Sequence, residues 1–366
     1  MVSCRGTLLA LVCSVVSIYL GYICNTHLIH FRIQRPFASV ATIPYTLLST
    51  SNVSIDPLVL ASMKQFGFFY VNHVPNYNSS QELDYLQQFF ALPDSEKMKY
   101  AVRKHNRGNR NIYRGYGPVV ETSGTQYKEI FNIGPHEAEP GHNFSDDALG
   151  RLRAISRERN VWPVTQDPGF DEGFKEVFRR GFDIRRNIAR SVIKSIGRSL
   201  GHPKLIERFT ESEFSTLGLR KYPMRTSVND KMFSTHDDVV LSELEHEDST
   251  VTILATFTNP GLQALYEGVY WDVPPSRDGF IVNIGTLIED IADKHIIAVR
   301  HRVKQINQLR YSIPFFFNPS FDADISTSIS GRQTTAGKNY KIFGEWMRDY
   351  LPAVEPGLLE EGIAGL

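Results

Sequence analysis

The sequence is poor in cysteine, and the three cysteines that it has, Cys4, Cys13 and Cys24, lie at its N-terminus. The rest of the chain therefore cannot form disulfides, use a catalytic thiolate or bind zinc through cysteine. Any metal ion held there needs histidine, aspartate or glutamate ligands, and 11 histidines are available.

The sequence also lacks an excess of charge of either sign. It has 40 Lys+Arg and 40 Asp+Glu residues, so its formal net charge is zero. Nucleic-acid-binding proteins usually carry a basic excess, and we therefore expect no nucleic-acid partner. Hydrophobic residues make up 42% of the chain, which is enough for a substantial core in one large domain or two ordinary ones.

Long hydrophobic runs are absent except near the N-terminus. Thr7 to Cys24 carries no charge and is just long enough to span a bilayer. Because no clear cleavage site follows, we predict a signal anchor in a single-pass membrane protein of the secretory pathway or ER, with secretion after signal cleavage as the alternative. N-x-Ser sequons at Asn52, Asn78 and Asn143 agree with a lumenal domain. The charges on either side of the run do not determine its topology.

Helical patterns dominate the first half of the chain. Residues 55–75 predict a helix, a break at Gly67 and a short strand, "FFYV". A second helix begins with a capping box from Ser79 to Glu82. Residues 170–200 give the clearest helix, with an apolar stripe on one face and Arg and Lys on the other, which we interpret as facing solvent.

Strand patterns dominate from residue 213 onward. "FSTLGLRKYP", "STVTILATF", "GLQALY", "GFIVNIG", "VRHRVKQ" and "RYSIPFFF" follow one another with turn residues between them. A β-rich core behind a helical half predicts a sandwich or jelly roll with helices packed on one sheet.

Two His-x-Asp patterns are candidates for part of a metal site, and each by itself is a weak signal. His236 and Asp238 lie in a polar stretch that resembles an inserted loop, so we regard them as a chance match. His246 and Asp248 directly precede an alternating strand. Residues two apart in an extended backbone point the same way, so both side chains could face a barrel interior.

A third ligand is available on a later predicted strand. His301 follows in "VRHRVKQ", whereas its rival His295 lies in a predicted loop. Two imidazoles and one carboxylate on a single face leave three coordination positions open, as in non-haem Fe(II) oxygenases. The alternative interpretation is that the three residues form a polar cluster at the end of a strand and bind no metal.

An arginine in an otherwise apolar strand predicts an anion site. Arg310 and Ser312 in "RYSIPFFF" point to one face, and a guanidinium with a nearby hydroxyl suits a carboxylate. An internal salt bridge is the alternative for Arg310. We interpret Asn283 as structural. Arg114 and Tyr116 either line the substrate pocket or serve domain packing.

The order His-x-Asp, "GLQ", "GFIVNIG", "HRV" and Arg-x-Ser resembles the iron- and 2-oxoglutarate-dependent dioxygenases, and most of all their isopenicillin N synthase-like branch. "FGFFYVNHVP" and "FFALPDSEKMKY" are similar to the N-terminal domain of that family. "LRKYP" is similar to a strand whose tyrosine, here Tyr222, faces the active site. The resemblance covers roughly residues 36 to 320.

The resemblance implies an α+β fold with a double-stranded β-helix (jelly roll) core, flanking helices and an α-rich N-terminal domain. The expected segments are a signal anchor or signal peptide with a stem (1–35), the N-terminal domain (36–165), a supporting helix (166–212), the jelly roll (213–325) and a helical tail (326–366). It further implies Fe(II) on His246, Asp248 and His301. 2-Oxoglutarate would bind Arg310, Ser312 and Tyr222, with O2 as oxidant and ascorbate as an optional reductant.

The implied activity is hydroxylation or desaturation of a small organic substrate, coupled to conversion of 2-oxoglutarate to succinate and CO2. Three alternatives stay open. The first is a 2-oxoglutarate-independent oxidase like isopenicillin N synthase, in which Arg-x-Ser grips the substrate carboxylate, although the tail here offers no convincing glutamine ligand. The second is an inactive binding protein on the same fold. The third, a zinc hydrolase, lacks a motif such as H-E-x-x-H.

Overall fold

The computed structural model describes residues 36–50, 53–119, 127–138, 144–209, 213–224 and 239–354. The chain divides into two units, Met1–Ser39 and Val40–Leu366. In the first unit, Pro36–Ser39 form a turn of 3-10 helix. The second unit contains all of the helices and strands described below.

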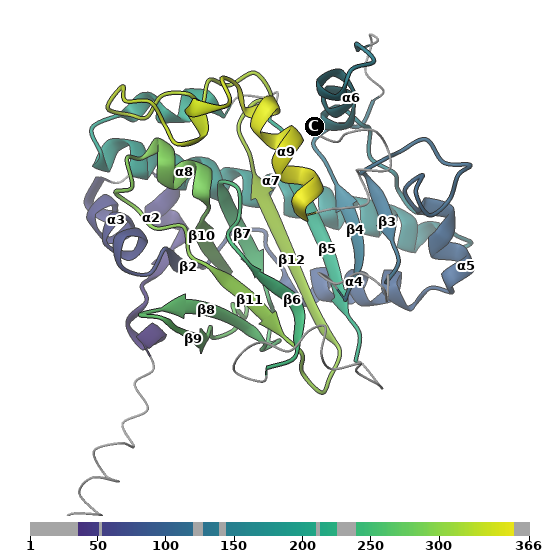
Figure 1. Cartoon of the computed structure of the whole chain (residues 1–366). Helices are drawn as coiled ribbons and strands as arrows, with labels where there is room; N and C mark the ends of the chain where they lie inside the picture. The colour runs from purple at the N-terminus through teal and green to yellow at the C-terminus, as the bar shows by residue number, and fades with distance from the viewer. Residues whose placement is uncertain are drawn as a thin grey trace, which may run out of the picture. The chain divides into compact units, whose positions relative to one another are not determined.

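Two β-sheets form the centre of the second unit (Figure 1). The larger sheet contains, in spatial order, β1 (Thr42–Pro44), β2 (Phe68–Asn72), β10 (Phe280–Ile284), β7 (Val251–Ala255), β12 (Arg310–Phe317), β5 (Thr216–Tyr222), β4 (Glu129–Ile133) and β3 (Gly115–Gly117). The smaller sheet contains β6 (Leu241–His246), β11 (His301–Lys304), β8 (Leu262–Tyr266) and β9 (Val269–Asp272). All of these strand pairs are antiparallel except β1 with β2, which are parallel.

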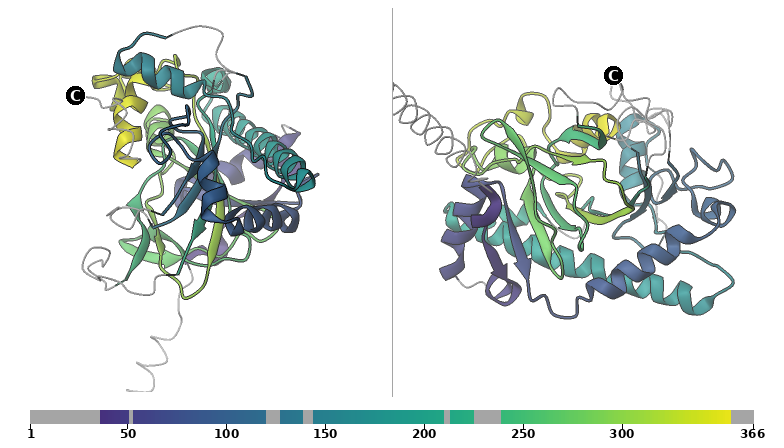
Figure 2. Two further views of the ribbon diagram at one scale, coloured as in Figure 1. Left: turned by 90° about the vertical axis from the view of Figure 1, so that its right-hand side faces the viewer. Right: turned by 90° about the horizontal axis from the view of Figure 1, so that it is seen from below.

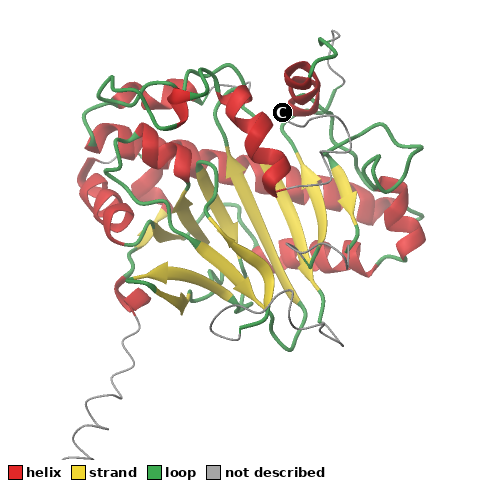
Figure 3. Ribbon diagram, in the orientation of Figure 1, coloured by secondary structure: helices red, strands yellow, loops and turns green. Residues whose placement is uncertain are grey.

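Helices cover one face of the larger sheet, as Figures 2 and 3 show. They are α2 (Tyr45–Ser49), α3 (Asp56–Gln65), α4 (Ser79–Ala91) and α7 (Pro168–Ser199). The other helices are α5 (Asp94–Lys97), α6 (Ala148–Ser156), α8 (Thr286–Ile291) and α9 (Phe343–Val354), and α9 lies on the side of the sheet opposite α7. The long α7 packs against β7 and β12. The ring of Phe182 meets that of Phe315 edge-on at 4.8 Å, and burial of each such side chain contributes about 1.5–3 kcal/mol.

This mixed α+β architecture with large sheets agrees with the predicted jelly-roll fold. The α-rich character expected of residues 36–165 is not confirmed, because this segment also supplies β1 to β4 to the larger sheet. The other segment boundaries stay predictions.

Two local predictions need correction. The cap of α4 is Asn78, whose side chain accepts a hydrogen bond from Gln81 N, so the helix begins one residue after its cap and Ser79 is not the cap. The basic face of α7 is not wholly exposed. Arg185 is completely buried and makes a bidentate pair with Glu82, both bonds at 2.7 Å. A buried cation is tolerated there because a buried carboxylate compensates it.

The membrane prediction is also corrected. Within the part of the chain that the structure describes, no helix is both long and apolar enough to cross a membrane. Residues 7–24, on which the prediction rested, lie outside that part, as do Asn52 and Asn143. We therefore keep neither the transmembrane or signal-anchor assignment nor the localisation derived from it.

Candidate active site

A cavity of about 300 Å³ lies between the two sheets. Strands β5, β7, β10 and β12 of the larger sheet line one side of it, and β6, β8 and β11 of the smaller sheet line the other. Residues of α9 also contribute to the lining. The volume lies at the lower end of the range for small-molecule pockets.

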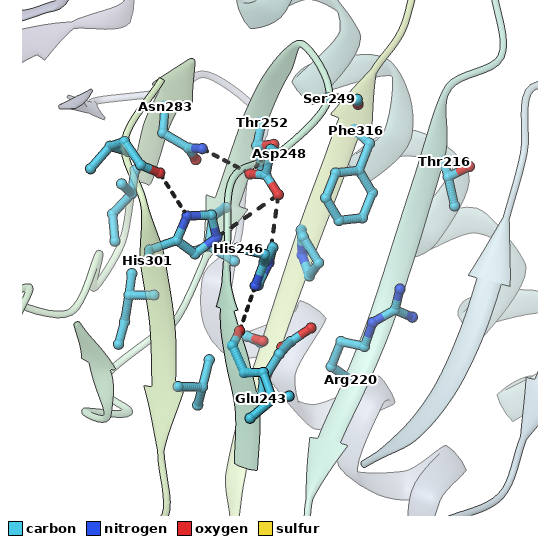
Figure 4. Close-up of a pocket in the computed structure, with 18 of the residues that line it drawn as sticks. Thr216, Arg220, Glu243, His246, Asp248, Ser249, Thr252, Asn283, His301 and Phe316 are labelled. Carbon is cyan, nitrogen blue, oxygen red and sulfur yellow. Dashed lines mark hydrogen bonds and ion pairs between the residues drawn. The ribbon is translucent and has the colours of Figure 1, made fainter. Parts of the chain in front are cut away.

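The three predicted metal ligands meet in this cavity (Figure 4). His246 ends β6 and His301 begins β11, and the two residues are direct partners in the β6–β11 ladder. Asp248 lies in the short connection between β6 and β7. Its Oδ1 is 3.9 Å from His246 Nε2 and 3.8 Å from His301 Nε2. Antiparallel pairing thus brings together residues that are far apart in the sequence.

Hydrogen bonds fix the orientation of each of these side chains. His246 Nδ1 lies 2.7 Å from the carbonyl oxygen of Leu244, and His301 Nδ1 lies 3.0 Å from that of Val299. Because a carbonyl only accepts, each Nδ1 donates a proton, and Nε2 is the nitrogen that each ring turns toward Asp248. Burial lowers the pKa of His246, and the neighbouring His301 lowers it further, which favours the neutral imidazole at His246.

Two polar side chains hold the far oxygen of Asp248. Thr252 Oγ1 donates to Asp248 Oδ2 at 2.6 Å, and Asn283 Nδ2 donates to the same atom at 2.8 Å. Burial acts to raise the pKa of Asp248, but the two imidazoles and these two donors outweigh it and lower the pKa. Asn283, which the sequence suggested was merely structural, therefore directly supports the carboxylate.

The donor set fits a divalent metal ion. The separations of 3.8–3.9 Å are too long for hydrogen bonds. They are short enough for one ion with bonds of about 2.0–2.2 Å to lie between the atoms. Two neutral imidazoles and one carboxylate, with the rest of the coordination sphere facing a cavity, is the donor set of non-haem Fe(II) oxygenases. His246, Asp248 and His301 could therefore hold Fe(II).

Arg310 and Ser312 lie side by side on β12 in the same cavity. Arg310 is 2% exposed. Its Nη1 donates to Ser312 Oγ at 3.2 Å, and its Nε donates to the carbonyl oxygen of Pro260 at 3.0 Å. Its Cζ lies 4.6 Å from the centre of the Tyr222 ring. No carboxylate of the described residues pairs with it, which argues against the internal salt bridge. Burying a guanidinium without a counter-charge is energetically costly, so we expect an anion to bind beside Arg310.

A buried ion pair lies next to this arginine. Lys128 Nζ pairs with Glu243 Oε1, and Tyr222 donates its hydroxyl to Glu243 Oε2 at 2.8 Å. Burial tends to raise the pKa of Glu243, but the attraction to Lys128 and the bonds it receives lower the pKa. The hydroxyl proton of Tyr222 is thus committed to Glu243, and it is the ring that contacts Arg310.

Several further pocket residues were missed in the sequence. Lys128 and Glu243 line the cavity although nothing in their local sequence indicated it. Arg220 also lines it, and its spacing of two residues from Tyr222 on β5 is the signal that could have found it. Arg114 does not belong to the lining. It is fully buried and donates to the hydroxyl of Thr216, a lining residue, at 2.7 Å.

The rival histidines do not contribute to this site. His295 follows α8 as an exposed residue and is not part of the cluster. His236 and Asp238 lie outside the described residues.

Comparison with known proteins agrees with this geometry. The model of the 2OG-Fe(II) oxygenase superfamily matches residues 218–319, which include the triad, Arg310 and Ser312. The model described as "non-haem dioxygenase in morphine synthesis N-terminal" matches residues 55–165. The chain belongs to the iron- and 2-oxoglutarate-dependent dioxygenase superfamily, in its isopenicillin N synthase-like branch. It is an Fe(II)- and 2-oxoglutarate-dependent dioxygenase.

Individual relatives support the same family. Isopenicillin N synthase from Flavobacterium sp. is 27% identical over 295 residues, covering 77% of this chain and 85% of that enzyme. The Streptomyces jumonjinensis enzyme is 27% identical over 334 residues, covering 88% and 97%.

Solved structures share the fold. Neurospora crassa T7H in complex with alpha-KG and thymine superposes with a TM-score of 0.64 at 21% identity, covering 86% of this chain and 96% of that one. JOX2 in complex with 2OG, Fe and JA superposes with a TM-score of 0.61 at 19% identity, covering 84% and 83%. At these identities the likeness concerns the fold alone.

Proposed function

We propose that this dioxygenase hydroxylates or desaturates a small organic substrate, with Fe(II) held by His246, Asp248 and His301. Bound Fe(II), with 2-oxoglutarate and O2, supplies the oxidising chemistry and leaves succinate and CO2. The convergence of the two Nε2 atoms on Asp248 Oδ1 is the observation that carries this proposal.

The roles of the chain's own residues follow from their contacts. The carbonyls of Leu244 and Val299 keep the imidazoles in the tautomer that offers Nε2 to the metal. Arg310, with Ser312 beside it, binds the distal carboxylate of 2-oxoglutarate, and the Tyr222 ring keeps the guanidinium in place. Apolar residues of the lining, among them Pro314 and Phe316, would contact the body of the substrate.

The comparison with isopenicillin N synthase raises a second candidate, an oxidase that does not use 2-oxoglutarate. We do not favour it, because the family model that matches the site residues is that of the 2OG-Fe(II) oxygenase superfamily. A binding protein that has lost its chemistry is disfavoured by the complete triad.

Anaerobic titration of the Fe(II)-loaded protein with 2-oxoglutarate tests the proposal. We expect a saturable visible charge-transfer band of the iron–2-oxoglutarate chelate, absent in His246→Ala and shifted to a much higher 2-oxoglutarate concentration in Arg310→Ala. His295→Ala, an exposed histidine outside the cluster, is the matched control and should behave like the wild type. Iron binding without the band would instead support the oxidase, and no iron binding would refute the metal site.

A further inference from the structure

A second buried arginine faces the cavity besides Arg310. Arg220 is 3% exposed and belongs to the cavity lining. It lies on β5, directly paired with Ser312 on β12. Figure 4 shows Arg220 and Thr216 on the β5 wall, across the cavity from His246, Asp248 and His301.

The guanidinium of Arg220 lacks an anionic partner within the described residues. Its Nη1 donates to Asn132 Oδ1 at 2.8 Å and to the carbonyl oxygen of Leu219 at 3.3 Å. Both acceptors are neutral. A buried cation with only neutral acceptors is unfavourable unless an anion reaches it from the cavity.

The backbone beside Arg220 makes room for its guanidinium. A Cβ added at Gly218 would lie 2.6 Å from both Cζ and Nη2 of Arg220. Asn132, which holds Nη1, is the residue opposite Gly218 on β4. The guanidinium therefore occupies a fixed position over Gly218, as expected for a binding residue and not for a loosely packed side chain.

The other charged groups of the cavity do not compensate the charge of Arg220. Lys128 and Glu243 neutralise each other, and Glu245, a further acidic residue of the lining, is exposed and pairs with Arg300. Under the proposed function, Fe(II) and doubly ionised 2-oxoglutarate cancel, and the charges of Asp248 and Arg310 cancel likewise. One positive charge, that of Arg220, is then left without compensation.

We propose that Arg220 binds a carboxylate of the primary substrate, and that the substrate is a small organic monocarboxylic acid. This inference rests on the proposed function, which assigns Arg310 to 2-oxoglutarate. Pro314, Phe316 and Phe214 give the lining an apolar character that suits the body of such an acid. Arg220 thus determines specificity, while the metal ligands and Arg310 serve the oxidation itself.

The test uses the full chain, loaded anaerobically with Fe(II) and 2-oxoglutarate, and a series of acids each paired with its primary amide. Benzoate, phenylacetate, hydrocinnamate, hexanoate and octanoate are the probes. Binding is measured as the rise in the thermal unfolding midpoint and by calorimetry. We expect acids of the series to bind at least about tenfold more tightly than their amides, because hydrogen bonds to charged groups are the stronger ones.

Two variants assign this preference to Arg220. Arg220→Leu should weaken acid binding about tenfold to a hundredfold, leave amide binding unchanged, and keep the 2-oxoglutarate affinity within about twofold. Gly218→Ala keeps the arginine but displaces its guanidinium, and it should weaken acid binding in the same way. Gly218→Ala therefore tests the role of Arg220 even if Arg220→Leu fails to fold.

The outcomes separate this inference from the proposed function. If the wild-type chain forms no 2-oxoglutarate chelate, the proposed function fails. If the chelate forms but acids and amides bind equally, or no acid binds, the substrate inference alone is overturned. A loss of 2-oxoglutarate affinity in Arg220→Leu as large as that in Arg310→Ala would also overturn it, because Arg220 would then belong to the cosubstrate site.

Discussion

Thr252→Val should weaken metal binding without unfolding the protein. The Thr252 hydroxyl donates to Asp248 Oδ2 at 2.6 Å, and the only other donor that the described residues give that atom is Asn283 at 2.8 Å. Valine has nearly the shape of threonine, so the change removes one hydrogen bond and leaves the packing of β7 intact. Asp248 would then lose one of the two hydrogen bonds to Oδ2 that orient its Oδ1 toward the histidines.

The magnitude follows from the strength of that support. Removing a residue that orients a metal ligand usually costs about tenfold to a hundredfold in metal affinity, and we expect a change within this range. The metal-free protein should lose much less, about 1 kcal/mol of its free energy of unfolding, because Asn283 still satisfies the carboxylate. Anaerobic Fe(II) titration gives the first quantity, and urea unfolding of the metal-free protein gives the second.

The matched control is Thr256→Val. Thr256 is buried one residue beyond the end of the same strand, and its hydroxyl accepts a hydrogen bond from Ser276 N at 2.8 Å. It should lower stability without altering Fe(II) affinity. Equal Fe(II) affinities in wild type and Thr252→Val, or equal losses in the two variants, would refute the supporting role of Thr252.

Two further predictions concern stability. Gly67 (φ +73°) and Gly201 (φ +76°) share a left-handed backbone, but a Cβ at Gly67 would lie 2.6 Å from the carbonyl oxygen of Ile297, while open space surrounds Gly201. Gly201→Ala should therefore cost about 1 kcal/mol and Gly67→Ala clearly more, and equal losses in urea unfolding would contradict the close approach. Burial, together with nearby arginines, lowers the pKa of His136 to about 4. The contribution of His136 to the free energy of unfolding is therefore complete above pH 6.5. It falls by at most about 1.4 kcal/mol per pH unit as the pH is lowered toward 4, because in this range only the unfolded chain takes up the proton. His136→Gln should flatten this dependence, and parallel pH curves for the two proteins would refute the assignment.

The sequence by itself predicted the strands that carry the site. Alternation in "STVTILATF" and "RYSIPFFF" marks β7 and β12, because residues two apart on a strand share a face. The short spacing of His246 and Asp248 was likewise enough to suggest a shared direction. Strand β6 was missed, because the stretch before His246 is polar and resembles a loop insertion.

Only the tertiary structure decided which distant residues meet. The ladder register that pairs His301 with His246 depends on how β6 and β11 associate, and no local pattern encodes it. The same holds for Asn283, which reaches Asp248 across the pairing of β10 with β7. Arg220 alternates with Tyr222 on β5, yet whether its charge is neutralised depends on the neighbouring strands. Local spacing determines the face of a residue, whereas its partners and its burial are set by contacts between remote segments.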